Sequence, residues 1–320
     1  MTDLAVVVAT HGRAHLLPRL LAALSRQEGA RPYEVVVVDD ASTDDTWAVL
    51  ARLTAEAAVP VRRIGLSRNL GPAAARNAGW RATAASRIAF TDDDCVPSAH
   101  WLAALDEALD GAELVQGRTL PAPDQPTGPF SRTLRIESED GFYQTCNVGY
   151  RRETLEAAGG FDEDFRHPAG EDTELAWRAI GAGARTAFVP GALVHHDVRP
   201  SSVLATLRDT PRWGSVVLAV RKHPELRERV HSRFFWRASH PPALLAVAGL
   251  MAVAGSRSAR GRAAGAALLL PYARFRLRTE PLPETGPRRR VALLPAALLL
   301  DATEVAVCAA ASVRHRRLLL

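Results

Sequence analysis

The sequence predicts an α/β fold over residues 1–200, followed by a mostly helical region over residues 201–320. Short runs of apolar, β-branched residues alternate in the first part with stretches in which leucine and alanine recur at helical spacing. Strands separated by helices form parallel βαβ units, with helices on both faces of one sheet. Acidic side chains follow several of the strands, at the edge where open α/β sheets bind ligands.

Five strands are expected before residue 120, because each is a short apolar run bounded by turn or helix signals. They are residues 4–9, 35–38, 61–65, 88–91 and 114–117. Helices are expected between them at 15–25, from about 44 to 57, at 71–85 and at 98–109. The second helix is preceded by Ser42, Thr43, Asp44 and Asp45, which are suitable capping residues.

Residues 119–145 are expected to form a loop, because four prolines lie within ten residues and no periodicity is visible. Regular structure resumes with a strand at 147–150 and helices at 153–158 and 171–180. Two short strands, 186–189 and 192–194, complete this part of the chain.

The region after residue 200 combines an amphipathic helical stretch, 201–221, with three apolar segments at 241–255, 263–273 and 291–313. None is a clean spanning helix, which needs about 20 apolar residues. They are expected to be interfacial helices, short re-entrant hairpins or a packed helical subdomain. Basic clusters lie between them, so an anionic membrane surface is the favoured partner and a soluble appendage is the alternative.

Composition excludes several classes of protein. Hydrophobic residues make up 47% of the 320 residues, enough for a substantial core, and the net charge of +5 arises mainly after residue 199. No zinc-finger, RNA-recognition or helix-turn-helix signature is present, so nucleic acid is not an expected partner. Three widely spaced cysteines indicate neither disulfides nor a zinc site.

With no signal peptide visible, the catalytic part is expected in the cytoplasm, at the inner face of the cell membrane.

Asp92, Asp93 and Asp94 directly follow the strand expected at 88–91. Carboxylates crowded at the end of a buried strand repel one another and lose hydration, so they are not expected to stay charged there without a cation. A hard divalent metal bound through oxygen resolves this conflict and commonly also holds a phosphate. The alternative is a solvated acidic turn that caps the helix starting near Ser98.

Residues 4–200 resemble the family 2 glycosyltransferases, which have the GT-A fold, a Rossmann-like mixed sheet flanked by helices. The resemblance rests on an ordered set of motifs: Thr10-His-Gly-Arg13, Asp39-Asp-Ala-Ser-Thr-Asp44, Asn69–Gly79, Thr91–Asp94, Gly159-Gly-Phe-Asp162, Gly170–Arg178 and Pro190–His196. It implies a nucleotide-sugar-binding half at 1–118 and an acceptor-binding half at 119–200. The basic and apolar extension after residue 200 resembles that of some actinobacterial members.

The resemblance implies Mg²⁺ or Mn²⁺ as the cofactor. Asp94 is the expected direct ligand, Asp92 contacts the ribose or metal-bound water, and Asp93 is an outer-sphere or solvated carboxylate. His196 is preferred over His195 as the histidine completing this site, because His196 shares a strand face with Ala192 and Val194. The alternative for His196 is a hydrogen-bonded core histidine.

The remaining donor-binding residues implied are Thr10, Arg13, Asp39, Asp40 and Arg76, together with Asp92 and Asp93. The resemblance implies that Asp40, rather than Asp39, accepts a hydrogen bond from the base, a role that suits a carboxylate because it only accepts when ionised. The alternative is a helix-capping turn. Arg76, one turn into its helix, could steer the diphosphate, and the alternative is a surface arginine.

Asp172 is implied as the catalytic base that takes the proton of the attacking acceptor hydroxyl. Glu171 and Arg178 complete the motif with structural or acceptor-orienting contacts, and the alternative for Asp172 is a helix cap. The expected reaction is the inverting transfer of one sugar from a nucleotide-diphospho-sugar to a hydroxyl acceptor. A UDP-sugar is the favoured donor. The acceptor is expected to be lipid-linked or to belong to the cell envelope or to secondary metabolism.

Other functions are disfavoured by specific residues. Processive synthases carry Gln-x-x-Arg-Trp, whereas this chain has Asp209 in place of the glutamine before Arg212 and Trp213. A nucleotidyltransferase would carry a glycine-rich loop where Ala9–Arg13 stands. A non-catalytic nucleotide-sugar-binding protein would lack the aspartate triplet or the base, and neither is missing.

Overall fold

The computed structural model describes residues 2–165, 167–279 and 286–320. The chain divides into two compact units. The first comprises the chain up to Gln125 together with Thr133–Val198, and the second comprises Pro126–Arg132 together with Arg199–Leu320. A short piece of the proline-rich loop therefore groups with the helical region.

The first unit is built on one mixed sheet of eight strands in the order β3-β2-β1-β4-β7-β6-β8-β5. Its strands are β1 (Leu4–Thr10), β2 (Tyr33–Asp39), β3 (Val61–Gly65), β4 (Arg87–Thr91), β5 (Cys95–Pro97), β6 (Leu114–Pro121), β7 (Asn147–Arg151) and β8 (Thr186–His196). Its helices are α1 (Leu17–Leu24), α2 (Thr46–Glu56), α3 (Pro72–Ala82), α4 (Trp101–Ala108), α5 (Arg152–Ala158) and α6 (Glu171–Gly181).

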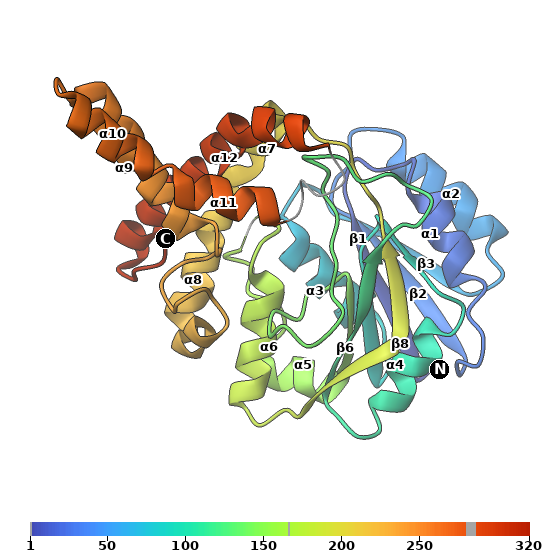
Figure 1. Ribbon diagram of the computed structural model, residues 1–320. Coiled ribbons are helices and arrows are strands. Elements are labelled where there is room, and N and C mark those ends of the chain that lie inside the picture. Colours follow the sequence, from blue (N-terminus) through green and yellow to red (C-terminus); the bar gives the residue numbers. More distant parts are fainter. Residues whose placement is uncertain (1, 166, 280–285) are drawn as a thin grey trace. The chain divides into compact units, whose positions relative to one another are not determined.

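The two faces of the sheet carry separate apolar cores, because side chains alternate along each strand. In β1, Leu4, Val6 and Val8 pack with α1, α2 and α4, whereas Ala5 and Val7 pack with α3, α5 and α6. Figure 1 shows the sheet between these two groups of helices. The predicted α/β architecture is thereby confirmed.

The strands are not all parallel, although the alternation of strands and helices in the sequence suggests parallel βαβ units. Strands β1 to β4 are parallel, but β7 runs antiparallel to both β4 and β6, and β5 runs antiparallel to β8. The strands expected at 186–189 and 192–194 are one strand, β8, and its pairing with β6 shifts register between Gly117 and Arg118. Strand β5 is only three residues long, which is too short for a periodic pattern of apolar residues to predict it.

Parallel pairing brings the ends of three strands to one edge of the sheet. Thr10, the last residue of β1, pairs with Asp39, the last residue of β2, and β1 also pairs with β4, which ends directly before Asp92. The polar residues that follow these strands therefore lie together.

Gly79 in α3 lies against the sheet and permits close helix packing. A Cβ built at Gly79 would lie 2.4 Å from a methyl group of Val7 and 3.1 Å from one of Val38. We therefore expect Gly79→Ala to lower the free energy of unfolding by about 1–3 kcal/mol through overpacking, although alanine is the better helix former. Denaturant unfolding measures this.

A matched control is Gly181→Ala at the end of α6, where a Cβ would meet nothing within 4 Å. It should leave stability unchanged or slightly raised. Equal stability of the two variants would contradict the packing argument.

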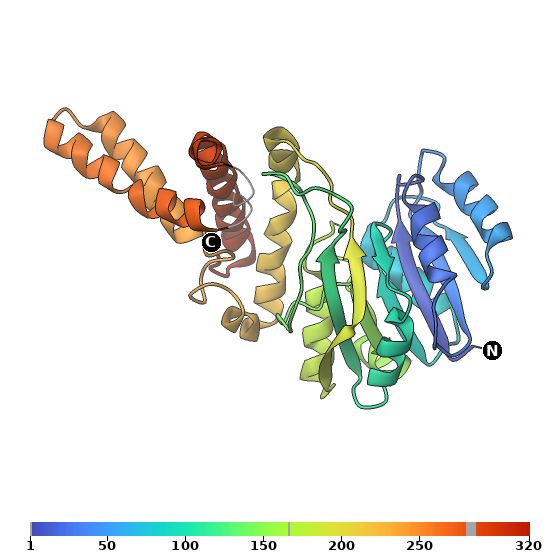
Figure 2. The ribbon, with the colours of Figure 1, turned by 45° about the vertical axis from the view of Figure 1, so that its right-hand side comes forward.

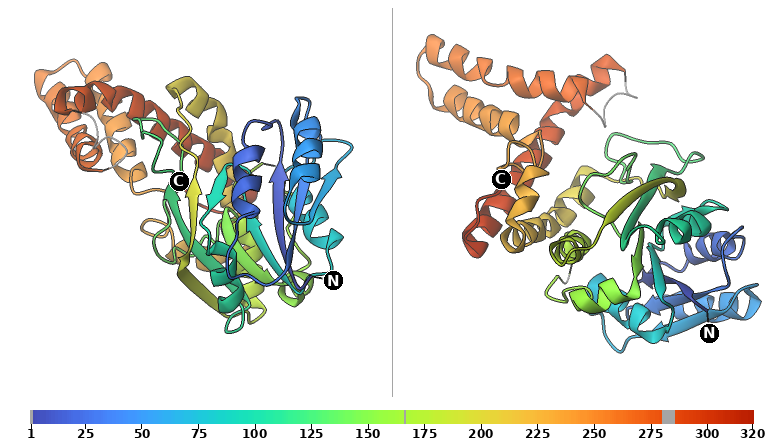
Figure 3. Two further views of the ribbon diagram at one scale, coloured as in Figure 1. Left: turned by 90° about the vertical axis from the view of Figure 1, so that its right-hand side faces the viewer. Right: turned by 90° about the horizontal axis from the view of Figure 1, so that it is seen from below.

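The second unit is helical, and Figures 2 and 3 show α9 lying beside α10 and α11. Its elements are α7 (Val203–Asp209), a 3₁₀-helix (Thr210–Trp213), α8 (Gly214–Lys222), a second 3₁₀-helix (Pro224–Glu228), α9 (His240–Gly255), α10 (Ala259–Ala267), α11 (Leu270–Arg278) and α12 (Pro287–His315). The helical stretch expected at 201–221 is thus three shorter helices. The segment expected at 263–273 is divided because Pro271 starts a new helix.

The third apolar segment, expected at 291–313, lies within one continuous helix, α12, whose run of apolar residues is interrupted by Asp301 and Glu304. Asp301 is buried and accepts hydrogen bonds from Ser239 (3.0 Å) and Tyr272 (2.6 Å), and it pairs with Arg276. These partners compensate the charge of Asp301, which explains how its carboxylate can be buried.

Candidate active site

The turn after β4 carries the aspartate triplet, and the pairing of β5 with β8 brings a histidine to it. Cys95 of β5 lies opposite His196 of β8, and the backbone N–H of Asp197 donates to the carbonyl of Asp94 at 2.8 Å. Two segments about 100 residues apart in the sequence are thereby fixed side by side at the edge of the sheet.

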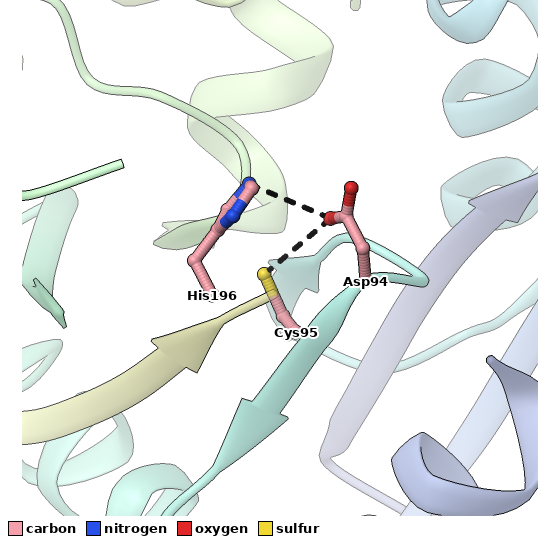
Figure 4. Close-up of side chains that lie close together, drawn as sticks. All are labelled: Asp94, Cys95 and His196. Atoms are coloured by element: carbon pink, nitrogen blue, oxygen red, sulfur yellow. Dashed lines mark hydrogen bonds and ion pairs between the residues drawn. The ribbon is translucent and has the colours of Figure 1, made fainter. Parts of the chain in front are cut away.

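The side chains of Asp94, Cys95 and His196 meet in this turn, and all three are buried (Figure 4). His196 Nδ1 is 2.9 Å from the carbonyl oxygen of Asp197. A carbonyl only accepts, so Nδ1 carries the hydrogen and a neutral ring leaves its Nε2 lone pair free. Nε2 lies 3.6 Å from Asp94 Oδ1, another acceptor. Two acceptors that face each other at this distance fit a shared cation.

Cys95 Sγ lies 3.9 Å from the same oxygen of Asp94. Burial, with the neighbouring Cys146 as a second cause, raises the pKa of the Cys95 thiol well above its usual range. The protonated thiol is a weak donor to Asp94, and hard cations prefer oxygen and imidazole to sulfur. Cys95 was not predicted as a site residue, since a lone cysteine beside the triplet gives no sequence signal.

Asp93 contacts the end of β1 and the residues that follow it. It accepts a hydrogen bond from Thr10 (2.7 Å) and pairs with Arg13 (2.5 Å), which also reaches Asp94 at 3.1 Å. Asp93 is buried rather than solvated, and burial, opposed by Arg13, raises its pKa to about 6. The structure therefore joins Thr10 and Arg13 to the triplet.

Arg76 links the triplet to α6. Its guanidinium donates to Asp92 (2.8 Å) and to Glu171 (2.9 Å), and the side chain is buried rather than on the surface. Burial alone would lower its pKa, but the two carboxylates raise the pKa of Arg76 above its ordinary value. Gly71, before the helix, has a φ of 91°, which favours glycine.

Asp172 lies at the start of α6, next to Glu171. Its carboxylate accepts backbone hydrogen bonds from Thr173 (2.8 Å) and Thr145 (3.4 Å). Desolvation, and then the charge of Glu171, raises the pKa of Asp172 to about 7. A carboxylate with this pKa is suited to accept a proton near neutral pH.

Arg178, six residues further along α6, has structural partners. It pairs with Glu174 and donates to the carbonyl oxygens of Ala158 and Gly160. It therefore ties α6 to the end of α5, as the structural alternative for this residue anticipated.

The two aspartates at the end of β2, Asp39 and Asp40, have different partners. Both oxygens of Asp40 accept backbone hydrogen bonds, from Leu70 and Gly71 at 2.8 Å each. Asp39 uses Oδ1 to accept from the amide and hydroxyl of Ser42. Asp40 thus holds the loop before α3.

Carboxylates outnumber guanidinium groups around the site. Two arginines, Arg13 and Arg76, face five carboxylates, those of Asp92, Asp93, Asp94, Glu171 and Asp172. The resulting excess of negative charge is buried or half-buried, so a cation would stabilise the arrangement. The residues present therefore fit a divalent metal, with Asp94 and His196 best placed to hold it.

Comparison with known proteins relates the chain to a known family. Residues 5–161 match the model of glycosyl transferase family 2. The chain is 30% identical over 239 residues to the pre-mycofactocin glycosyltransferase of Mycobacterium tuberculosis, covering 70% of this chain and 48% of that protein. It is 33% identical over 230 residues to the succinoglycan biosynthesis protein ExoO of Rhizobium meliloti, covering 64% of each. The chain thus spans only about half to two thirds of the length of these relatives.

Among solved structures, the mannosyltransferase PcManGT from Pyrobaculum calidifontis, in complex with GDP-Man and Mn²⁺, superposes with a TM-score of 0.66. The match covers 95% of this chain and 86% of that one at 22% sequence identity. It shows that the two chains share a fold.

Proposed function

The chain belongs to glycosyl transferase family 2, and from that premise we propose that it is an inverting, metal-dependent glycosyltransferase. It moves one sugar from a nucleotide-diphospho-sugar to a hydroxyl acceptor. The relatives named above are a glycosyltransferase and a succinoglycan biosynthesis protein, which supports an acceptor hydroxyl on a larger molecule.

The observation that carries the proposal is the bridge made by Arg76. One guanidinium binds Asp92, in the triplet, and Glu171, directly before Asp172. Asp172, the carboxylate with the raised pKa, is thereby held near the aspartate triplet at the ends of the strands. A donor diphosphate at the cluster would place its anomeric carbon within reach of a base on α6.

The metal and diphosphate site is assigned to Asp94 and His196, with Asp92 in an accessory role. When bound, Mg²⁺ or Mn²⁺ supplies Lewis-acid neutralisation of the charge that develops on the leaving diphosphate. Asp94 and His196 hold their ligand atoms in place through the β5–β8 pairing. Asp93 and Thr10 orient Arg13, which is thereby available to a phosphate oxygen.

The base of the donor is assigned to the end of β2. Asp40 was the preferred acceptor from sequence, but its two oxygens each already accept a backbone N–H. Asp39 Oδ2 has no recorded partner among the described residues, so we assign base recognition to Asp39 and loop support to Asp40. Both the uracil N3–H and the guanine N1–H can donate to a carboxylate, and a UDP-sugar remains our first choice.

Asp172 acts as the base. Its carboxylate takes the proton of the acceptor hydroxyl while the oxygen attacks the anomeric carbon from the face opposite the diphosphate. One attack of this kind inverts the anomeric configuration. The configuration of the product, read from the anomeric proton coupling by NMR, tests this, and a product that retains the donor's configuration would overturn the inverting assignment.

We expect kcat/KM to rise with pH through about 7, because only the deprotonated Asp172 accepts a proton and burial raises its pKa to about 7. Below that value the rate should fall about tenfold per pH unit. A pH profile of kcat/KM for sugar transfer, taken at saturating metal concentration, measures this rise. A profile that stays flat from about pH 5.5 to 8.5 would show that a different group is the base.

We further propose that the second unit attaches the enzyme to the inner face of the cell membrane, near a lipid-linked or membrane-delivered acceptor. Residues 241–256 contain no charged side chain. Large apolar side chains of α9 to α11 and the turns between them are exposed: Leu244, Leu245, Leu250, Met251, Leu268 and Leu270. One helix, residues Arg288–His315, is long and apolar enough to cross a membrane. Its buried Asp301, paired with Arg276, favours a helix that lies on the membrane rather than one that spans it.

Leu250→Ser combined with Met251→Ser should reduce flotation of the full chain with anionic liposomes, because both side chains are exposed apolar surface on α9. Leu204→Ser, at an exposed leucine of α7, is the control and should float like the wild type. If the wild type itself stays in the soluble fraction, the second unit is a packed appendage and the membrane assignment is wrong.

A further inference from the structure

Five basic side chains line a pocket of about 400 Å³ in the second unit, between the end of α8 and the end of α12. They are Arg221, Arg314, His315, Arg316 and Arg317. No carboxylate lines the pocket. None of these residues belongs to the candidate active site, and none was singled out by the motifs.

The four guanidinium groups have no recorded ion-pair partner in the parts of the chain that the structure describes. Elsewhere in the same unit, arginines are paired: Arg276 with Asp301, Arg237 with Glu304 and Arg132 with Asp209. All four guanidinium groups are exposed, so water screens their mutual repulsion in part. An anion bound among them would remove the remaining repulsion and form charge-assisted hydrogen bonds.

The pKa of His315 reflects this concentration of positive charge. Partial burial, and then the charges of Arg221 and Arg314, lower the pKa of His315 below its ordinary value. The pocket therefore disfavours a further positive charge.

The backbone of the pocket is held in a fixed conformation. Arg316 has a φ of 52°, a left-handed geometry that usually favours glycine at the end of a helix. The N–H of Arg317 bonds to the carbonyl of Ser312, whose hydroxyl donates to the carbonyl of Leu319 and accepts from its N–H. Leu319 is fully buried. Arg316 thus adopts, at a conformational cost, a backbone geometry that suits glycine. The hydrogen bonds around it hold this turn and its arginines in place.

Two exposed apolar side chains neighbour the basic residues in the sequence, although neither lines the pocket itself. Val313, directly before Arg314, is 82% exposed, and Leu318, directly after Arg317, is 51% exposed. A ligand with an anionic head and an apolar chain would cover both kinds of surface, whereas a free phosphate would leave the apolar side chains in water.

We propose that this pocket binds the phosphate group of an anionic lipid, with the guanidinium groups on the phosphate and Val313 and Leu318 against the acyl chain. Arginine favours this ligand because its planar fork can donate two hydrogen bonds to one phosphate. The inference deepens the proposed membrane association by naming a headgroup site, and it does not depend on glycosyl transfer.

Calorimetric titration of the full chain with a short-chain, monomerically soluble phosphatidylglycerol tests the proposal without requiring a membrane. Arg314→Gln with Arg317→Gln should weaken binding about tenfold or more, since the pocket loses two of its four guanidinium charges. Arg26→Gln with Arg52→Gln removes the same charge from exposed positions of the first unit and should change binding less than about twofold. Thermal unfolding checks that both variants are folded, and donor turnover in the same samples reports the transferase function separately.

Two results would overturn the proposal. One is equal binding of phosphatidylglycerol by the pocket variant and the wild type, or an equal loss in the control variant. The other is inorganic pyrophosphate that binds the wild type as tightly as the lipid does and loses affinity to the same extent in the pocket variant, which would make the pocket a site for soluble phosphate. Short-chain phosphatidylcholine, which has no net charge, should bind weakly in every case.

Discussion

Asp172→Asn should bind the donor like the wild type and lose sugar transfer by about 10²–10⁴-fold or more. The substitution keeps the shape of the side chain and an oxygen that can accept from the N–H of Thr173, but the amide cannot take a proton from the acceptor. Steady-state transfer rates, together with calorimetric titration of the donor, separate the two effects.

The same variant should be as stable as the wild type or more so at pH 8. Because burial raises the folded pKa of Asp172 to about 7, its charged form opposes folding. Stability from this group is therefore fully present below the unfolded pKa, near 3.9 for an unperturbed aspartate, and is lost as pH rises through about 7. Asp164→Asn, at an exposed aspartate, is the control and should change neither property. Near wild-type turnover by Asp172→Asn would exclude it as the base.

Asp94→Ala should abolish transfer and weaken binding of a nucleoside diphosphate. Asp94 faces the Nε2 of His196 at 3.6 Å, so the change removes the one carboxylate best placed to share a cation with that nitrogen. The loss should exceed the about 10–100-fold that removal of an outer-shell partner typically costs. Titration with the nucleoside diphosphate in the presence of Mn²⁺ measures it.

A ligand comparison controls for general damage to the site. The nucleoside without phosphates should bind Asp94→Ala and the wild type equally, because it makes no use of a cation. If the nucleoside and the nucleoside diphosphate lose affinity to the same extent, Asp94 supports the fold of the site rather than the diphosphate.

The elements of the first unit could be predicted because their signals are local. Strand β2 is a run of valines and α1 has leucines at helical spacing, and each pattern specifies one element without reference to the rest of the chain. The preference for His196 over His195 also came from a local rule, alternation along β8. The structure indeed brings His196, rather than His195, next to Asp94.

The contacts that assemble the site could not be predicted in the same way. Arg13 pairs with Asp93 across 80 residues, and Arg76 pairs with Glu171 across 95 residues. Such pairs depend on strand order and on antiparallel β7, neither of which has a periodic signal. The burial of Asp301 in α12 could not be predicted for a related reason, since Asp301 finds its partners on α11 and before α9, far along the chain.

The most direct test of the central claim is release of nucleoside diphosphate from a panel of nucleotide-diphospho-sugars, UDP-sugars first, with and without Mn²⁺. The account predicts that the wild type consumes at least one donor, that excess chelator abolishes this turnover, and that added Mn²⁺ or Mg²⁺ restores it. Turnover that is undiminished in excess chelator would contradict the metal site at Asp94 and His196, and failure to turn over any donor with metal present would contradict the proposed glycosyl transfer itself.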